Sequence, residues 1–345
     1  LAQSLKGECH LKTIALILAA GRENQMHSER AKELHELLGK TLLDTTAETL
    51  RPLAGKSIVV LGHHAQELTP ALPEWCLSCV QDSSLGFGTA KAVMAALTMI
   101  DEDALVLVTA GDKPCISPNS YQQLLHAMEN AHYHAAVLYA DQRHPEGYDR
   151  LIFDGDGDVK RIAHSADLLP PEEDIPSVNT GVYCFRSEVL RKALPNMTAD
   201  DAGVYHISDL IGQMADAGMH IAAVPAENPQ EAKLIVNRAD LAEATSFIIR
   251  RHCAALMRSG VTLLDPSNTY VEGDVIVGQD TVIYPGCVLQ RGTVIGSRCV
   301  LYPGCRLART QVDDDAVLEQ VVAEDSSIAA GAKVGPFVCL RGQKI

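Results

Sequence analysis

The sequence lacks a long hydrophobic run, a surplus of positive charge and the two best-known phosphate-binding motifs. No apolar stretch approaches the about 18 residues that a membrane-spanning helix needs, so no membrane partner is expected. The formal net charge of −15 argues against a nucleic-acid partner, because binding a phosphate backbone needs clustered lysines and arginines. A nucleotide substrate stays open, since a few local cations can neutralise its phosphates.

The two missing motifs concern the first glycine turn. Ile14-Ala-Leu-Ile-Leu-Ala-Ala-Gly21 is a small and aliphatic run ending in glycine, as nucleotide-binding α/β domains often begin. The dinucleotide fingerprint needs G-x-G-x-x-G, and only Gly21 is present. A P-loop needs a glycine five residues before the Gly-Lys-Ser/Thr sequence. Leu34 occupies that position ahead of Gly39-Lys40-Thr41, so the motif is absent. Gly21 therefore serves another kind of phosphate chemistry, or none.

The 10 cysteines lack the spacing of a disulfide framework or a zinc site. They are scattered in mostly apolar contexts, and Cys76-Leu-Ser-Cys79 has no second pair near it. Lys6 and Lys12 ahead of the first apolar run could mimic a signal peptide, but the run is more typical of a buried strand. We therefore expect a reduced, cytoplasmic protein.

The 345 residues suggest two domains, and the pattern of the chain agrees. Up to about residue 236, aliphatic runs alternate with helix-like stretches, which predicts a mostly parallel sheet with helices on both faces. We expect strands over 57–62, 104–112, 134–140 and 178–185, and helices over 91–100, 120–131 and 206–218. Residues 151–162 indicate a hairpin: the DGDGD sequence resembles a calcium loop, but Val159 and Ser165 stand where that loop needs Gly and Glu.

A continuous helix is predicted over residues 238–260, and a six-residue repeat follows it. Aliphatic residues occupy Val277, Ile283, Leu289, Ile295, Leu301 and Leu307, and small residues occupy Thr281, Cys287, Thr293, Cys299 and Cys305. This pattern predicts a parallel β-helix, in which three hexapeptides form each triangular coil and the aliphatic side chain fills the axis. We expect the repeat to resume at Val322, Ile328, Val334 and Leu340, after an irregular stretch that holds Asp313-Asp-Asp315.

Several segments follow one another in an order and spacing typical of one family: LILAAG (16–21), AKELHELLGKTLL (31–43), GTAKAV (88–93), AGDKP (110–114), PEGYDRLI (145–152), VNTGVYCF (178–185), GVYHISDLI (203–211) and residues 256–286. Together they resemble the sugar-1-phosphate nucleotidyltransferases. The resemblance is strongest to the bifunctional N-acetylglucosamine-1-phosphate uridylyltransferase/glucosamine-1-phosphate acetyltransferase family. It implies a Rossmann-like nucleotidyltransferase domain (1–237), a linker helix (238–260) and a left-handed parallel β-helix (261–345) that lacks most of the acetyltransferase part.

The resemblance also implies a reaction, a cofactor and an assembly. A phosphate oxygen of N-acetylglucosamine-1-phosphate would attack the α-phosphate of UTP, with Mg²⁺, lysines and backbone N–H groups offsetting the charge. Two alternatives stay open: another base or sugar, or a nucleotide-sugar-binding regulator without turnover. A homotrimer is implied as well, and we expect its interface to include an outward aliphatic row of Ile276, Val282, Val288, Val294 and Val300.

The resemblance assigns roles to individual residues. Asp112 and Asn237 match the metal ligands, Lys32 matches a phosphate-contacting lysine, and Gly147 and Asn179 match contacts to the amino sugar. The nucleotide is implied to lie against Leu18, Ala19, Ala20, Gly21, Gln81, Gly88 and Thr89. Simpler roles stay open: a helix cap for Asp112, a solvated face for Lys32, a turn for Gly147 and a strand-end hydrogen bond for Asn179.

Three departures from the family bear on substrate binding. In the first glycine loop, Glu23 replaces a glycine and Gln25 replaces the triphosphate-binding arginine, a loss that typically costs about 1.5–3 kcal/mol unless Arg22 substitutes. The DSSLGF segment after Gln81 is longer than usual, which leaves the choice of base open. Ala163 replaces the glutamate expected before His164 in the sugar pocket, which leaves the choice of sugar open.

Overall fold

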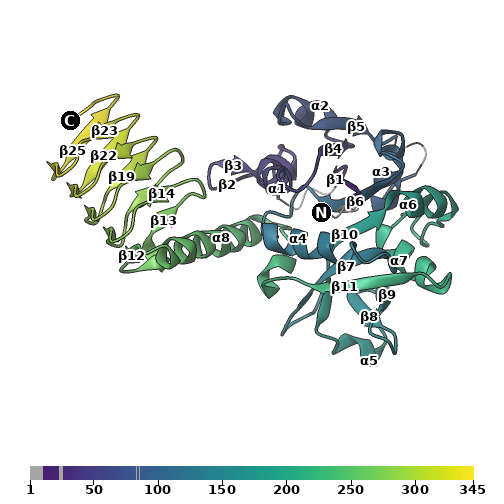
Figure 1. The fold of residues 1–345 in the computed structure, drawn as a ribbon. Helices are drawn as coiled ribbons and strands as arrows, with labels where there is room; N and C mark the ends of the chain where they lie inside the picture. Colours follow the sequence, from purple (N-terminus) through teal and green to yellow (C-terminus); the bar gives the residue numbers. More distant parts are fainter. Residues whose placement is uncertain (1–10, 23–25, 83, 85) are drawn as a thin grey trace, which may run out of the picture. The chain divides into compact units, whose positions relative to one another are not determined.

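The chain folds into two compact units in this computed structural model, which describes residues 11–22, 26–82, 84 and 86–345 (Figure 1). The first unit comprises the chain up to His35 together with Thr41–Asp240. The second comprises Glu36–Lys40 and Leu241–Ile345. Each unit has its own hydrophobic core, so each is described separately.

The first unit is built on a nine-stranded mixed sheet whose main order is β11-β7-β10-β6-β1-β4-β5. Neighbouring strands run parallel except at β10, which is antiparallel to both β6 and β7. The predicted mostly parallel sheet is therefore confirmed, with one reversed strand. The bounds are β1 (Lys12–Ala19), β4 (Lys56–Leu61), β5 (Leu77–Val80), β6 (Ala104–Ala110), β7 (Tyr133–Asp141), β10 (Ser177–Arg186) and β11 (His220–Pro225).

Helices cover both faces of this sheet, as predicted (Figure 1). Successive side chains of a strand point to opposite faces, so Leu16 lies in one core and Ile17 in the other. The first core includes residues of α3 (Thr89–Ala95), α6 (Ser187–Ala193) and α7 (Ile207–Asp216), and the second includes residues of α1 (Leu42–Leu50), α2 (Ala65–Leu68) and α4 (Pro118–Ala127). Within the described part of the chain, no helix combines the length and apolar character that crossing a bilayer requires.

The predicted hairpin is present and its turn binds its own backbone. β8 (Arg150–Phe153) and β9 (Val159–Ala163) are antiparallel, and β8 joins the sheet through β10. The Asp154 carboxylate accepts the N–H groups of Asp156 and Asp158 at 2.9 and 3.0 Å. The DGDGD sequence is thus a hairpin turn, as its departure from the calcium-loop pattern indicates. A short helix, α5 (Pro170–Glu173), follows.

The second unit contains most of α8 (Arg238–Arg258) and a triangular parallel β-helix with strands in three sheets, consistent with the left-handed type. The six predicted axial residues and the five small residues are all buried, and every described cysteine is a free thiol. The first sheet comprises β12 (Thr262–Leu263), β15 (Val282–Ile283), β18 (Val300–Leu301), β21 (Val317–Leu318) and β24 (Lys333–Val334). The second comprises β13 (Tyr270–Val271), β16 (Val288–Leu289), β19 (Arg306–Ala308), β22 (Val321–Glu324) and β25 (Val338–Arg341). The third comprises β14 (Ile276–Val277), β17 (Val294–Ile295), β20 (Gln311–Val312) and β23 (Ser327–Ile328).

The stretch predicted to be irregular continues the β-helix with shorter sides. Strand pairing aligns Ile295 with Val312, Leu301 with Leu318 and Leu307 with Ala323. The axial position is therefore Ala323, and the prediction of Val322 is wrong: its side chain points outward and is 41% exposed. The phase shifts because the sides that begin at Leu307, Leu318 and Ala323 hold five residues instead of six. The resumed register at Ile328, Val334 and Leu340 is confirmed.

The predicted outward aliphatic row is wrong. Val282 and Val300 lie on one sheet of the β-helix, Val288 lies on the second, and Ile276 and Val294 lie on the third. A spacing of six moves to the next side of the triangle, so residues of one face recur about every 18 positions, as Val282 and Val300 do. The homotrimer stays a prediction, without the support of that row.

The corrected phase predicts different costs for one substitution at two valines. Val312 is fully buried at the axis and Val322 points outward. Val312→Ala should lower the free energy of unfolding by about 2 kcal/mol through lost burial and a residual cavity, whereas Val322→Ala should change it by less than about 0.5 kcal/mol. Calorimetry of the β-helix unfolding transition checks this, and equal shifts in both variants would contradict the register.

Candidate active site

The candidate active site lies where β1 and β6 end. The two strands are parallel neighbours in which Leu18 pairs with Ala110. The N–H of Gly111 donates to the carbonyl oxygen of Leu18 at 2.8 Å, which continues the pairing beyond β6. Ala20, Gly21 and Asp112 therefore follow directly from the same edge of the sheet. The carboxyl edge of a parallel sheet is where open α/β folds bind their ligands.

Asp112 is held as a carboxylate by two lysines. Lys32, in the short helix η1 (Lys32–Leu34), forms an ion pair with Asp112 Oδ2. The Asp112 side chain is only 15% exposed, and burial alone would disfavour its charge. The charges of Lys32 and Lys113, with the hydrogen bond from Lys32, nevertheless hold the pKa of Asp112 below its usual value. Burial in turn lowers the pKa of Lys113, an effect that the charge of Asp112 opposes.

The second oxygen of Asp112 fits a metal ligand. Asp112 Oδ1 is buried and has no hydrogen-bond partner among the described residues. A buried acceptor is rarely left unpaired, and an ionised carboxylate oxygen is the donor that Mg²⁺ prefers. The helix-cap role considered for Asp112 is wrong, because Ser117 caps the following helix, accepting the N–H of Ser120.

Asn237, the other predicted metal ligand, caps α8. Its side-chain oxygen accepts the N–H groups of Ala239 and Asp240 at 2.8 and 3.1 Å. The Asp240 carboxylate accepts the N–H of Asn237 at 3.1 Å in return. This reciprocal arrangement fixes the start of the helix. Metal binding by Asn237 stays a prediction.

The first glycine loop leaves room beside Gly21. Its φ angle is not positive, and a Cβ built on it would meet none of the described protein atoms within 4 Å. Neither the backbone conformation nor a described neighbour demands glycine here, so among the described residues this position leaves open surface next to Ala20. The Arg22 guanidinium lies 4.6 Å from the centre of the Phe87 ring in a cation–π contact. Glu23 and Gln25 lie outside the described residues.

The residues predicted to contact the base also organise their own loop. Gln81 is buried and donates to the carbonyl oxygen of Gly86 at 3.3 Å. Gly88 has φ +119°, and a Cβ there would lie 2.3 Å from the carbonyl oxygen of Tyr205, so only glycine fits. The Thr89 hydroxyl accepts the N–H of Ile207 at 2.9 Å. Contact of Gln81, Gly88 and Thr89 with a base stays a prediction.

On the predicted sugar side, Asn179 is bonded at both ends of its carboxamide. It donates to the hydroxyl of Tyr183 at 2.8 Å and accepts the N–H of Gly181 at 3.0 Å. The structure therefore supports the hydrogen-bonding role in the strand, and a sugar contact stays a prediction. Gly147 has φ +80° and open space around it, as a turn glycine would.

Lys113 connects the phosphate side to the sugar side, and the sequence reasoning missed it. Its side chain is 8% exposed. A Cβ on Gly181 would lie 3.9 Å from Lys113 Nζ, which places this ammonium beside β10. Asp112 and Asp149 both favour its charged form. The available signal was its position in AGDKP, directly after Asp112 at the carboxyl end of β6.

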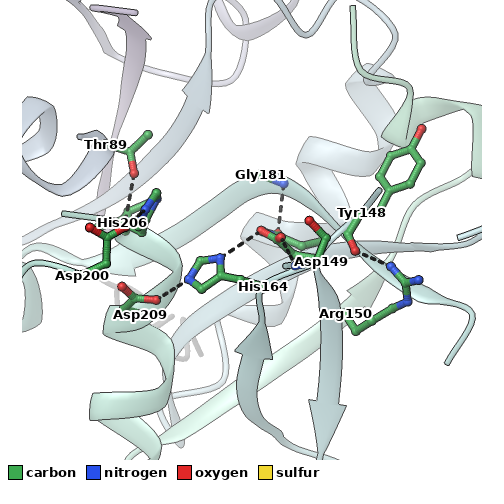
Figure 2. A network of polar contacts seen from close by, with 12 residues as sticks. Thr89, Tyr148, Asp149, Arg150, His164, Gly181, Asp200, His206 and Asp209 are labelled. Atoms are coloured by element: carbon green, nitrogen blue, oxygen red, sulfur yellow. Dashed lines mark hydrogen bonds and ion pairs between the residues drawn. The ribbon is translucent and has the colours of Figure 1, made fainter. Parts of the chain in front are cut away.

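A second charged group, also missed by the sequence reasoning, surrounds His164. Figure 2 shows its ring between two carboxylates. His164 Nε2 lies 2.6 Å from Asp209 Oδ1, and Nδ1 lies 3.6 Å from Asp149 Oδ2. These two contacts raise the pKa of His164 to about 10, and the contact with Asp149 has the larger effect. The ring is therefore an imidazolium at neutral pH. Burial, the largest single effect, opposes the charge of Asp149, but the contact with His164, the N–H of Ser165 and the charge of His206 together outweigh it and lower the pKa of that carboxyl.

The raised pKa predicts a pH-dependent contribution of His164 to stability. The imidazole pKa is about 10 in the folded chain and 6.5 ordinarily, so its contribution is fully present below pH 6.5 and is lost as pH rises through about 10. His164→Gln should therefore lower the free energy of unfolding more at about pH 6 than at about pH 10. Denaturant titrations of both proteins measure the difference. His126→Gln, at a more exposed histidine paired with Glu129, is the control, and a pH-independent loss in His164→Gln would contradict the assignment.

Comparisons with known proteins agree with this architecture. Residues 15–217 match the MobA-like NTP transferase domain, and residues 274–309 match the bacterial transferase hexapeptide repeats. The bifunctional protein GlmU of Alkaliphilus metalliredigens is 33% identical over 335 residues, which cover 96% of this chain and 73% of that relative. GlmU of Exiguobacterium sp. is 35% identical and GlmU of Bacillus subtilis 34% identical, each over 97% of this chain and 74% of the relative. The similarity includes both units, so the protein belongs to the GlmU-like family of sugar-1-phosphate nucleotidyltransferases.

Proposed function

We propose that the protein transfers a uridylyl group from UTP to N-acetylglucosamine-1-phosphate, giving UDP-N-acetylglucosamine and pyrophosphate, with Mg²⁺ as cofactor. Membership of the family supports sugar-1-phosphate nucleotidyl transfer as the reaction class. The observation that carries the proposal is the Asp112 carboxylate, which is held ionised by Lys32 and Lys113 and has one buried oxygen without a hydrogen-bond partner in the part of the chain that the structure describes.

The reaction is a displacement at the α-phosphorus. An oxygen of the sugar phosphate forms a bond to that phosphorus, the bond to the oxygen bridging the α- and β-phosphates breaks, and pyrophosphate leaves with the electron pair. Two anionic substrates must be held in line, and Lys32 and Lys113 provide positive charge for them at the carboxyl edge of β6. Mg²⁺, when held by Asp112 with Asn237, would offset the charge on the phosphate oxygens.

We further propose that Asp149 supplies the carboxylate of the sugar pocket that Ala163 lacks. Strand pairing places Arg150 opposite Ala163, so Asp149 lies across the hairpin from His164. The Asp149 side chain is 30% exposed, and its Oδ1 accepts the N–H of Ser165 at 3.0 Å. An ionised oxygen with remaining acceptor capacity suits a sugar hydroxyl or an N-acetyl N–H.

Two features of the chain favour the alternative functions. Ala163 stands where the family has a glutamate in the sugar pocket, which favours a different sugar-1-phosphate. The Arg22 guanidinium lies over the Phe87 ring, a contact that competes with binding of a triphosphate, and this arrangement favours weak triphosphate binding and hence a regulator without turnover.

A substrate panel with one isosteric substitution tests these functions. Pyrophosphate release is measured for four nucleoside triphosphates and several sugar-1-phosphates with Mg²⁺. We expect activity with UTP and N-acetylglucosamine-1-phosphate, reduced about 10²–10³-fold in Asp112→Asn because a neutral amide would hold Mg²⁺ at the phosphates less tightly than the carboxylate does. Asp101→Asn, at an ion-paired aspartate near Lys12 and Lys56, is the matched control and should keep full activity.

The outcomes separate the candidates. Activity with another pair of nucleoside triphosphate and sugar-1-phosphate, lost in Asp112→Asn, would change the proposed substrates and support the proposed mechanism. Full activity in Asp112→Asn would contradict the role of this carboxylate. Binding of UDP-N-acetylglucosamine by folded protein without pyrophosphate release from any pair would favour the regulator.

A further inference from the structure

Three segments of the first unit bring two histidines and an aspartate together. His132 directly precedes β7, His220 begins β11, and Asp158 closes the turn between β8 and β9 (Figure 1). Each offers one ligand atom, and these atoms all lie within 4.8 Å of one another. The function proposed above uses none of these residues.

The contacts inside the group are close and direct. His220 Nδ1 lies 2.7 Å from Asp158 Oδ2, and the Asp158 side chain is 14% exposed. The centres of the His132 and His220 rings are 3.8 Å apart, with 30° between their planes. The N–H of His220 donates to His134 Nδ1 at 3.3 Å, which fixes the backbone from which the ring projects. The sheet thus positions His220 directly, and His132 and Asp158 each lie one residue before a strand.

The sheet topology explains why the two histidines lie close together and why they lie far from Asp112. β7 and β11 are parallel neighbours in which His220 pairs with Tyr133, so His132 and His220 lie at the amino ends of their strands. β10 is antiparallel to both β6 and β7, so β6 and β7 run in the same direction. Because Asp112 follows the carboxyl end of β6, the histidines lie at the opposite edge of the sheet.

We propose that His132, Asp158 and His220 form a binding site for a divalent transition metal ion of the Zn²⁺ type. Two imidazole nitrogens and one carboxylate oxygen are a donor set that Zn²⁺, Co²⁺ and Ni²⁺ accept and that Mg²⁺ does not favour. Asp158 and His220 also border a cavity of about 490 Å³. Its space allows water or a small ligand to complete the coordination of the ion.

Metal binding at this site ties the hairpin to the sheet edge. Asp158 lies in the turn of the β8–β9 hairpin, whereas Asp149 and His164 flank its other end. A bond network from the turn to β7 and β11 therefore restrains the element that carries the proposed sugar-pocket carboxylate. The site itself stands independently of the proposed function, because its ligands and its edge of the sheet are different.

Co²⁺ binding by the full chain tests the site. Equilibrium dialysis is performed in excess Mg²⁺, so that carboxylate sites which accept Mg²⁺ are occupied, and visible spectra of the bound Co²⁺ identify its ligands. The wild type should bind one Co²⁺ more than His220→Ala, and the affinity of that site should fall at least about tenfold in Asp158→Asn. His126→Ala, which removes another exposed histidine, should bind as the wild type does.

The result that overturns the site is equal Co²⁺ binding by the wild type, His220→Ala and Asp158→Asn. A second result would also overturn the site. If the Co²⁺ spectrum of every variant consisted only of the intense charge-transfer bands of Co²⁺-thiolate bonds, the metal would be bound by cysteines instead. Asp158→Asn keeps the side-chain shape, so it provides the comparison if His220→Ala fails to fold.

Discussion

The largely buried ion pair between Lys32 and Asp112, with Lys113 beside it, is the interaction on which the candidate active site depends. Burying an isolated carboxylate costs several kcal/mol, and only well-placed opposite charges offset that cost. Lys32 comes from η1 and Lys113 from the residue after Asp112, so the end of β6 and the segment before α1 must meet accurately. Two cations around one carboxylate, of which one oxygen has no partner among the described residues, would suit the anionic substrates and the metal of the proposed function.

Lys113 extends this charge arrangement across the sheet. Its ammonium lies close to Gly181 of β10. The charge of Asp149, a residue of the network around His164, stabilises this ammonium. The predicted phosphate side and the predicted sugar side are therefore electrostatically linked through one buried side chain. The β8–β9 hairpin adds a second link, because its two ends hold the His164 network and the proposed transition-metal site.

Much of the fold could be predicted from sequence because hydrophobic periodicity is a local property. The alternation of β1 between two cores and the axial hexapeptide residues follow directly from spacing. The prediction failed at Val322, where sides of five residues shift the phase without any composition signal, and for the aliphatic row, where consecutive repeats occupy different sheets. Both errors concern how the coil closes in three dimensions.

The candidate site was predictable only in part, for a similar reason. Asp112 and Lys32 were predicted from a family resemblance, and the structure joins them. Lys113 and Asp149 were missed, because their importance comes from pairing across β10 and the hairpin, which the sequence does not display. Gly88 gains a reason that the sequence could not display: the close carbonyl oxygen of Tyr205 requires glycine there, while the base contact that the family resemblance implies stays a prediction.

A double-mutant cycle on Lys32 and Asp112 tests the central claim that these residues act as one unit. The rate constant kcat/KM for pyrophosphate release is measured in the wild type, Lys32→Met, Asp112→Asn and the double variant. The account predicts strong non-additivity, with the double variant about as slow as the slower single variant, because either change already dismantles the pair. Losses that simply multiply would show that the two side chains act independently and would contradict the account.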